Sequence, residues 1–180
     1  MIVSGVAIDS EIAGAIIDRA IEGDEMAFAR IVAVYHGDMA RIAYFVSGDL
    51  DVAADAEQAA WTITWRRLGT LRDPARLRAW LMSVAANEAR QIMRSQRRRT
   101  VRELAVDGPA SSPDPDRAAL IDLANAVAHL DHRDRTLLGL RYIADLDSET
   151  IGRELGLSAS GVRVRLHRLL GRLREELGDD

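Results

Sequence analysis

Apolar residues recur at the spacing of an α-helix along nearly the whole chain, and this pattern constrains the fold more than any other feature. Residues spaced in this way line one face of a helix, whereas half-buried strands alternate apolar and polar residues. Such alternation by β-branched residues is scarce in this sequence. Hydrophobic residues make up 48% of the chain, which is enough to bury a core. We therefore predict an all-α fold.

One segment interrupts the helical pattern and divides the chain. Residues 106–116, with the sequence VDGPASSPDPD, contain three of the four prolines. Proline and glycine clusters of this kind form loops rather than packed elements. We predict two small helical domains, at residues 1–100 and 118–180, joined by a flexible Pro-rich linker at residues 101–117.

Capping residues and breaks in the pattern give approximate bounds for the helices. Asp or Ser can cap the start of a helix, and Gly can end one. In the first domain we predict helices from Asp9 or Ser10 to the Gly23–Asp24 break, from Asp24 past Tyr35, and over residues 39–46, 51–68 and 75–98, with a loop at residues 69–76. In the second domain we predict helices over residues 118–130, 131–143, 148–155 and 159–177.

The net charge of −4 conceals a strong segregation of charge along the chain. Residues 1–60 carry a net charge of −8, residues 61–105 carry +8 and residues 106–180 carry −4. Within the last block, residues 158–174 hold five arginines and no acid. All 24 basic residues are arginine, whose planar guanidinium group suits bidentate contacts to phosphate or guanine. Two basic surfaces on an acidic chain predict a nucleic-acid partner.

The second basic surface begins within SETIGRELGLSASGVRVRLHRL, residues 148–169, which has a helix–turn–helix pattern. Gly156 can take the left-handed conformation that ends the first helix, and Ser158 can cap the second. Helical periodicity then buries Val162 and the leucines that follow it. The residues that point outward or flank the buried face form a predicted DNA-reading set, which comprises Ser160, Arg163, Val164, Arg165, His167 and Arg168.

An ordinary helical hairpin with solvated charges is the alternative interpretation of this pattern. Val164 favours DNA recognition, because an apolar side chain in the middle of an arginine-rich surface suits contact with a thymine methyl group. The absence of acids in the last helix up to Arg174 favours it as well.

The first basic surface includes RQIMRSQRRRTVR, residues 90–102, at the end of the long predicted helix. Positive charge is favourable at a helix C-terminus, so solvated arginines would explain this segment as well as a second DNA contact does. Trp61, Trp65 and Trp80 lie in the same block. Core packing is the expected role for most of them, although an unstacked base could lodge near the loop at residues 69–76.

Four segments in order resemble bacterial RNA polymerase sigma factors of the extracytoplasmic-function (ECF) group, which have only the domains sigma-2 and sigma-4. The resemblance covers nearly the whole chain. The segments are GDEMAFARIVAVYHGDMARIA, AADAEQAAWTITWRRL and LRAWLMSVAANEARQIMRSQRRR in sigma-2, and LGLSASGVRVRLHRLLGRLR in sigma-4. The sequence departs from the family pattern at Ala59, where an acid is usual, and at Gly161, where threonine is usual.

The resemblance implies three binding sites, assigned here position by position. The helix that docks on the β′ clamp of core RNA polymerase is matched by Asp55, Gln58, Trp61 and Trp65. The part that melts and reads the −10 promoter element is matched by Arg72, Asp73, Arg76, Asn87, Arg90 and Arg94. The −35 element is read by the positions of the DNA-reading set given above. The implied partners are core polymerase and promoter DNA, and an anti-sigma factor is a further expectation of the family.

Two other classes of function remain as alternatives. A stand-alone helix–turn–helix regulator would bind duplex DNA without polymerase, usually as a dimer. An enzyme is disfavoured because the chain has no lysine, no phosphate loop and no nucleophile motif, and we predict no catalytic residue and no cofactor. Its four histidines are scattered and suggest no metal site; they are His36, His129, His132 and His167.

The sequence also gives an expectation about location. It contains no apolar run of 18 residues, and acidic residues occur within the first twenty positions, so neither a spanning helix nor a signal peptide fits. Cysteine is absent, which suits a reducing compartment. We predict a cytoplasmic protein without membrane insertion.

Overall fold

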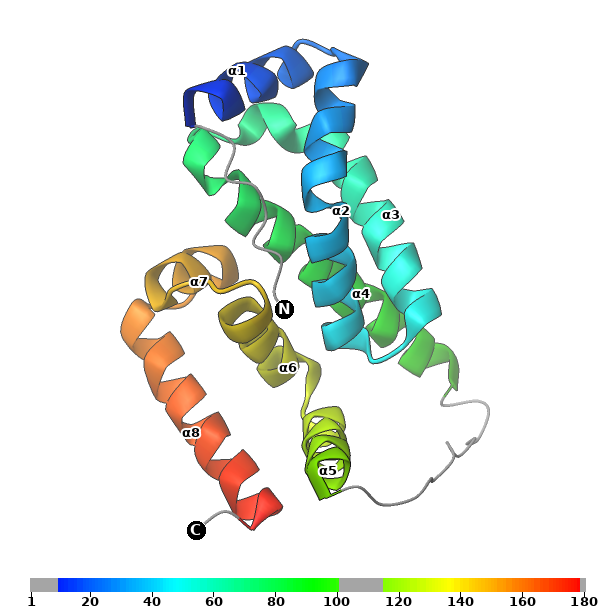
Figure 1. Cartoon of the computed structure of the whole chain (residues 1–180), viewed down its shortest axis with the longest axis vertical. Coiled ribbons are helices and arrows are strands. Elements are labelled where there is room, and N and C mark those ends of the chain that lie inside the picture. The colour runs from blue at the N-terminus through cyan, green and yellow to red at the C-terminus, as the bar shows by residue number, and fades with distance from the viewer. Residues whose placement is uncertain (1–9, 101–114, 179–180) are drawn as a thin grey trace.

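A computed structural model describes residues 10–100 and 115–178, and every regular element within these ranges is helical. The all-α prediction is confirmed for this part of the chain. Figure 1 shows the helices in two groups, with α1 to α4 at one end of the molecule and α5 to α8 at the other. The predicted linker falls largely on residues 101–114, which lie outside the described residues.

The first group forms a bundle of long helices. Asp24 caps α2 through hydrogen bonds from the N–H groups of Met26 and Ala27, and Asp49 caps α3 in the same way. Helices α2, α3 and α4 pack against one another and enclose a core that includes Met39, Ile42 and Leu81. The elements of this group are α1 (Ser10–Ile21), α2 (Glu25–Ser47), α3 (Leu50–Arg67), the 3-10 turns η1 (Leu68–Thr70) and η2 (Pro74–Arg76), and α4 (Leu77–Thr100).

Helix α2 is a single helix of 23 residues, so the prediction of a separate helix at residues 39–46 is wrong. Gly37 lies between the two predicted helices, and a glycine inside a helix costs about 1 kcal/mol relative to alanine. The helix continues because it buries residues on both sides of that glycine, among them Ile31 and Met39, in the same core.

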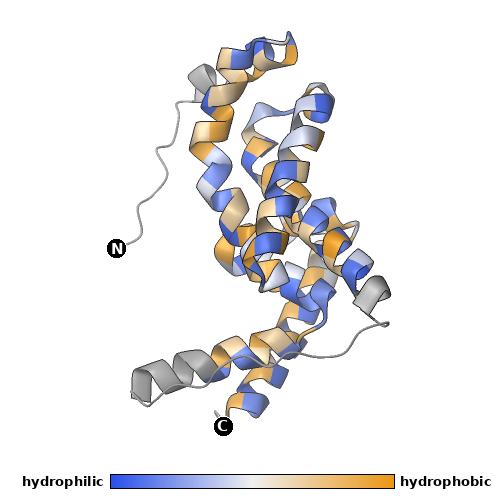
Figure 2. Cartoon of the chain, turned by 90° about the vertical axis from the view of Figure 1, so that its right-hand side faces the viewer, coloured by the Kyte–Doolittle hydropathy of each residue, from blue (hydrophilic) through white to orange (hydrophobic). Residues whose placement is uncertain are grey.

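The second group contains helices of 7 to 19 residues and a π-helical turn. Figure 2 shows apolar and polar residues interspersed along the same helices, as expected of amphipathic helices that bury one face. Helix α5 begins at a proline, three residues before the predicted start, because proline suits the first turn of a helix. The elements are α5 (Pro115–His129), α6 (His132–Leu138), the π-helical turn η3 (Gly139–Ile143), α7 (Ser148–Leu155) and α8 (Ala159–Leu177).

A buried arginine of the second group joins it to the first. Arg135 of α6 donates hydrogen bonds to the backbone oxygens of Val46, at 3.1 Å, and Ser47, at 3.4 Å, at the end of α2. It also donates to the backbone oxygen of Ala128, at 2.6 Å. Because α2 has no basic residue in its own last turn, Arg135 supplies the positive charge that a helix C-terminus favours.

Apolar and ionic contacts extend this interface between the two groups. A Cβ atom built on Gly139 of η3 would lie 3.0 Å from Cδ1 of Phe45 and 3.6 Å from the side chain of Ile42, both on α2. Arg76 of η2 forms an ion pair with Glu154 of α7, with 2.8 Å between Nη2 and Oε1. The two groups of helices are therefore closely packed rather than separate.

Replacing Gly139 with leucine is expected to separate the two groups. The three atoms nearest to its Cβ position all belong to α2, so the larger side chain collides with the first group. Small-angle X-ray scattering should record a larger radius of gyration than for the unmodified chain. The control is Gly14→Leu, because no atom lies within 4 Å of the Cβ position at Gly14. An unchanged radius for Gly139→Leu would contradict the prediction.

Candidate nucleic-acid interface

The predicted helix–turn–helix forms with the expected local geometry. Gly156 ends α7 in the left-handed conformation, with φ 70° and ψ 34°. Ser158 caps α8 and accepts a hydrogen bond from the N–H of Gly161 at 3.0 Å. Asp147 caps α7, and hydrogen bonding from the backbone N–H of Thr150 lowers the pKa of this carboxyl group. These side chains fix where the two helices begin and end.

Helix α8 has one buried face and one exposed face. Val162, Leu166, Leu169 and Leu173 are buried in the domain core, whereas Leu177, which was predicted to be buried, is 36% exposed at the helix end. The exposed side of the helix presents most of the predicted −35 readers. Those exposed positions are Ser160, Arg163, Val164, His167 and Arg168.

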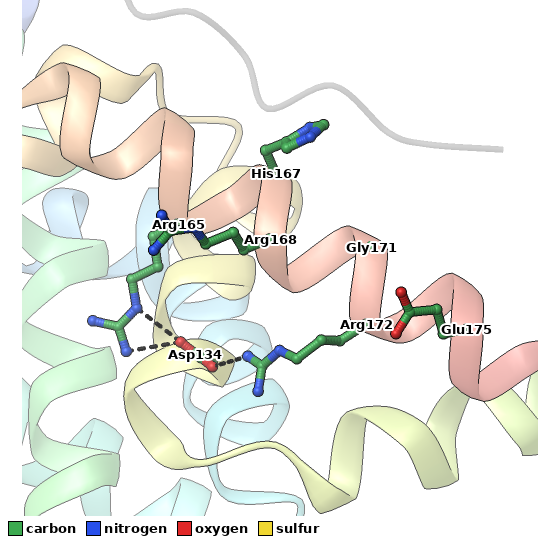
Figure 3. Close-up of a pocket in the computed structure, with 7 residues that line it drawn as sticks. All are labelled: Asp134, Arg165, His167, Arg168, Gly171, Arg172 and Glu175. Atoms are coloured by element: carbon green, nitrogen blue, oxygen red, sulfur yellow. Dashed lines mark hydrogen bonds and ion pairs between the residues drawn. The ribbon is translucent and has the colours of Figure 1, made fainter.

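Arg165 is the exception within that set, because its guanidinium group is bound by an acid. Its Nε and Nη2 atoms lie 2.8 Å and 2.7 Å from Oδ1 of Asp134, in the first turn of α6. Arg172, which lies further along α8, binds Oδ2 of the same carboxylate. This arginine was not among the residues predicted from the sequence. Figure 3 shows both arginines pointing toward Asp134, while His167 points away.

The predicted −10 residues of the loop between α3 and α4 occupy different environments. Arg72 and Asp73 are exposed. The side chain of Asp73 accepts a hydrogen bond from the N–H of Ala75 at 3.0 Å, and it thereby caps the turn η2. Arg76 is half-buried in its ion pair with Glu154.

The predicted −10 residues of α4 lie next to an arginine of the second group. Asn87 and Arg90 are half-buried, and Arg94 is exposed. Burial lowers the pKa of Arg90, and the positive charges of Arg94 and Arg133 lower it further. Arg133 belongs to α6 and was not selected from the sequence. Such a concentration of positive charge favours an anionic partner.

The predicted polymerase-binding residues lie together on α3. Asp55 and Gln58 are exposed, Trp61 is half-buried and Trp65 is 44% exposed. Phe28 of α2 packs edge-on against both tryptophans, with ring centroids 5.9 Å and 4.8 Å away. A shallow hollow on this face is lined by residues of α2 and α3 that include Gln58, Trp61 and Trp65.

Glu57, an acid that was not predicted as a site residue, binds two side chains behind this face. Glu57 is nearly buried and accepts a hydrogen bond from Nε1 of Trp61 at 3.1 Å, and it also contacts Nδ1 of His36. Trp80 packs against the core, as expected for most of the tryptophans. Trp61 is thus oriented by both a ring contact and a hydrogen bond.

Within residues 10–100 and 115–178, no group of three or more histidines and acids is placed to hold a metal ion. Over the same ranges, no helix has the length and apolar character needed to cross a membrane.

Comparison with known proteins matches both groups of helices to one family. Sigma-70 region 2 matches residues 31–99, and sigma-70 region 4 matches residues 126–175. The ECF RNA polymerase sigma factor SigL of Mycobacterium tuberculosis is 32% identical over 147 residues, covering 77% of this chain and 83% of SigL. The probable RNA polymerase sigma factor RfaY of Xanthomonas campestris pv. campestris is 31% identical over 173 residues; the match covers 88% of this chain but only 42% of RfaY.

A solved structure has a similar fold. The sigma factor RpoE from Bartonella quintana, determined in complex with the anti-sigma factor NepR, superposes with a TM-score of 0.68. The two chains are 22% identical, and the match covers 85% of this chain and 98% of RpoE.

The chain belongs to the sigma-70 family, whose members direct RNA polymerase to promoters. Within that family it is a sigma factor of the ECF group, as the resemblance of its sequence predicted. Core RNA polymerase and promoter DNA are therefore its partners. The alternative of a stand-alone regulator is not favoured, because region 2 matches as well as the helix–turn–helix.

Proposed function

We propose that this sigma factor reads the −35 element with the exposed face of α8. The proposal rests on a single observation, which is that Arg163, Val164 and Arg168 are exposed on a capped helix that carries no acid up to Arg174. Arginine can bind guanine edges or phosphates, and an exposed valine suits a thymine methyl group. Ser160 and His167 complete the proposed contact surface. Arg165, the remaining predicted reader, is instead bound by Asp134.

The −10 element is proposed to bind the η2 turn and the neighbouring side of α4. Arg72 and Arg94 are exposed and can contact phosphates directly. Arg76, Asn87 and Arg90 are half-buried. Arg76 is paired with Glu154 of α7 and Arg90 lies near Arg133 of α6, so full exposure of these two arginines requires those helices to move away. Asp73 shapes the turn through its hydrogen bond to Ala75.

The −35 and −10 promoter elements are too far apart on DNA for both domains to reach them while the domains stay closely packed. Their positions differ by about 25 base pairs, which corresponds to about 85 Å of duplex at a rise of 3.4 Å per base pair. One molecule that binds both elements must therefore separate sigma-4 from sigma-2. The hydrogen bonds of Arg135 and the Arg76–Glu154 pair would break in that step.

The exposed face of α3 is the proposed contact with the polymerase clamp. Asp55 and Gln58 offer polar groups, and the adjacent Trp65 offers an exposed aromatic ring. Aromatic residues in a partly apolar surface are typical of sites that dominate binding between proteins.

Regulation and location are proposed from the relatives. RpoE was solved with an anti-sigma factor, and we infer that an anti-sigma factor also binds this chain. Sigma factors are initiation factors rather than catalysts, so no enzymatic activity is proposed. Because sigma factors act on RNA polymerase, we propose that the protein is cytoplasmic.

Transcription start mapping tests the proposed function. Purified protein is combined with sigma-free core RNA polymerase and genomic DNA from the source organism, and the 5′ ends of the transcripts are sequenced. We expect starts that are absent with core polymerase alone and that share two upstream motifs near −10 and −35. Starts no different from those of core polymerase alone, with folded protein, would contradict the proposal.

A further inference from the structure

The side chain of Asp134 is 8% exposed and binds two arginines of α8. A buried carboxylate is stable only when its charge is paired and its oxygens are hydrogen-bonded. Both oxygens of Asp134 are used in this way, Oδ1 by Arg165 and Oδ2 by Arg172. Asp134 belongs to α6 and not to the helix–turn–helix itself.

The two arginines lie on the same side of α8 because they are two helical turns apart. Their side chains cross from α8 to α6 and meet at one carboxylate (Figure 3). Their exposures differ, since the Arg165 side chain is 38% exposed and that of Arg172 is 60% exposed. Arg168 lines the same hollow without a bond to Asp134.

We propose that Asp134 is a positioning residue for recognition of the −35 element. Its carboxylate holds the side chains of Arg165 and Arg172 against α6, so that neither guanidinium group contacts DNA phosphates. Base reading is then left to Arg163, Val164 and Arg168. This inference rests on the proposed function of α8.

The physical reason concerns specificity. An arginine that binds phosphate strengthens binding to every DNA sequence alike, because phosphates carry no sequence information. Two arginines directed at the protein instead lower the affinity for non-specific DNA. The same bonds fix the rotation of α8 against α6, and this sets which side chains face the bases.

The salt dependence of DNA binding tests the inference. Each arginine that neutralises a phosphate adds about 0.9 to the slope of log K against log salt. Binding of the full chain to a short duplex of arbitrary sequence is followed by fluorescence anisotropy over a series of salt concentrations. The Asp134→Asn variant should bind more tightly and have a slope steeper by about 1 to 2. The control is Asp122→Asn, which changes the net charge equally at an exposed position on α5.

A second variant keeps the Asp134 carboxylate in place. Arg172→Gln removes an arginine from the surface, and the slope should stay unchanged if that arginine does not contact DNA. A slope reduced by about 0.9 for Arg172→Gln would overturn the inference. Equal slopes for Asp134→Asn and Asp122→Asn would overturn it as well. This holds even if Asp134→Asn lowers the melting temperature, because Asp134 would then stabilise the fold without affecting DNA binding.

A third variant separates this inference from the function on which it rests. Arg168→Ala should weaken duplex binding, because Arg168 is exposed on the proposed reading face. If Arg168→Ala has no effect, the proposed role of α8 fails and the inference fails with it. If Arg168→Ala weakens binding but Asp134→Asn leaves the slope unchanged, only the inference is overturned.

Discussion

Replacing Arg163 and Arg168 together with alanine is expected to abolish promoter-directed transcription while binding to core RNA polymerase is retained. Both side chains are exposed on α8, one turn or more apart, and neither forms an ion pair within the described residues. A bidentate contact to a base contributes about 1–3 kcal/mol of discrimination, so the loss of two contacts lowers activity about a hundredfold or more. The measurement is run-off transcription from a mapped promoter, with polymerase capture measured in parallel.

A matched double variant distinguishes lost contacts from lost charge. Arg153→Ala with Arg174→Ala removes the same two charges from exposed positions of the same domain, outside the proposed reading set. This control should keep most promoter activity. Unchanged promoter-specific transcription by the Arg163 and Arg168 double variant would count against their assignment as DNA readers. An equal loss of transcription in the control would show that the loss comes from the change in net charge.

Changing Asp55 and Gln58 to alanine is expected to prevent capture of core RNA polymerase. Both side chains are exposed on α3, and Gln58 lines the hollow together with Trp61 and Trp65. Central residues of an interface contribute about 2 kcal/mol or more each, so the double change should weaken capture by a factor on the order of a hundred or more. A pull-down of sigma-free core polymerase by the purified chain measures this effect, and transcription from every promoter should fall with it.

The control changes the same two residue types, one aspartate and one glutamine, at positions outside the proposed polymerase contact. Asp18→Ala with Gln91→Ala alters one exposed acid and one exposed amide on α1 and α4. Capture by this variant should match that of the unmodified chain. Full capture by the Asp55 and Gln58 double variant, with its helicity intact, would place the polymerase contact elsewhere.

Local features of the fold could be predicted from the sequence. The bounds of α7 and α8 follow from Gly156 and Ser158, whose conformations depend on neighbouring residues only. The single helix α2 was not predicted, because the core that carries it past Gly37 is built by α3 and α4. Helix propensity along the chain does not include such packing between helices.

The candidate site was predictable only in part for the same reason. The exposed face of α8 follows from helical periodicity, and the exposed residues of α3 follow from the family pattern. The pairing of Arg165 with Asp134 joins residues 31 positions apart, and that of Arg76 with Glu154 joins residues 78 apart. Such pairs depend on how whole helices pack, which spacing along one helix cannot reveal.

The hydrogen bonds from Arg135 to the end of α2 can form only late in the synthesis of the chain. Arg135 follows Ser47 by 88 residues. At a synthesis rate of about 5–20 residues per second, the ribosome adds Arg135 roughly 4 to 18 seconds after the end of α2. During that interval the carbonyl groups of Val46 and Ser47 lack the hydrogen bonds that Arg135 donates. Any folding of the nascent first domain during that interval therefore proceeds without these two bonds.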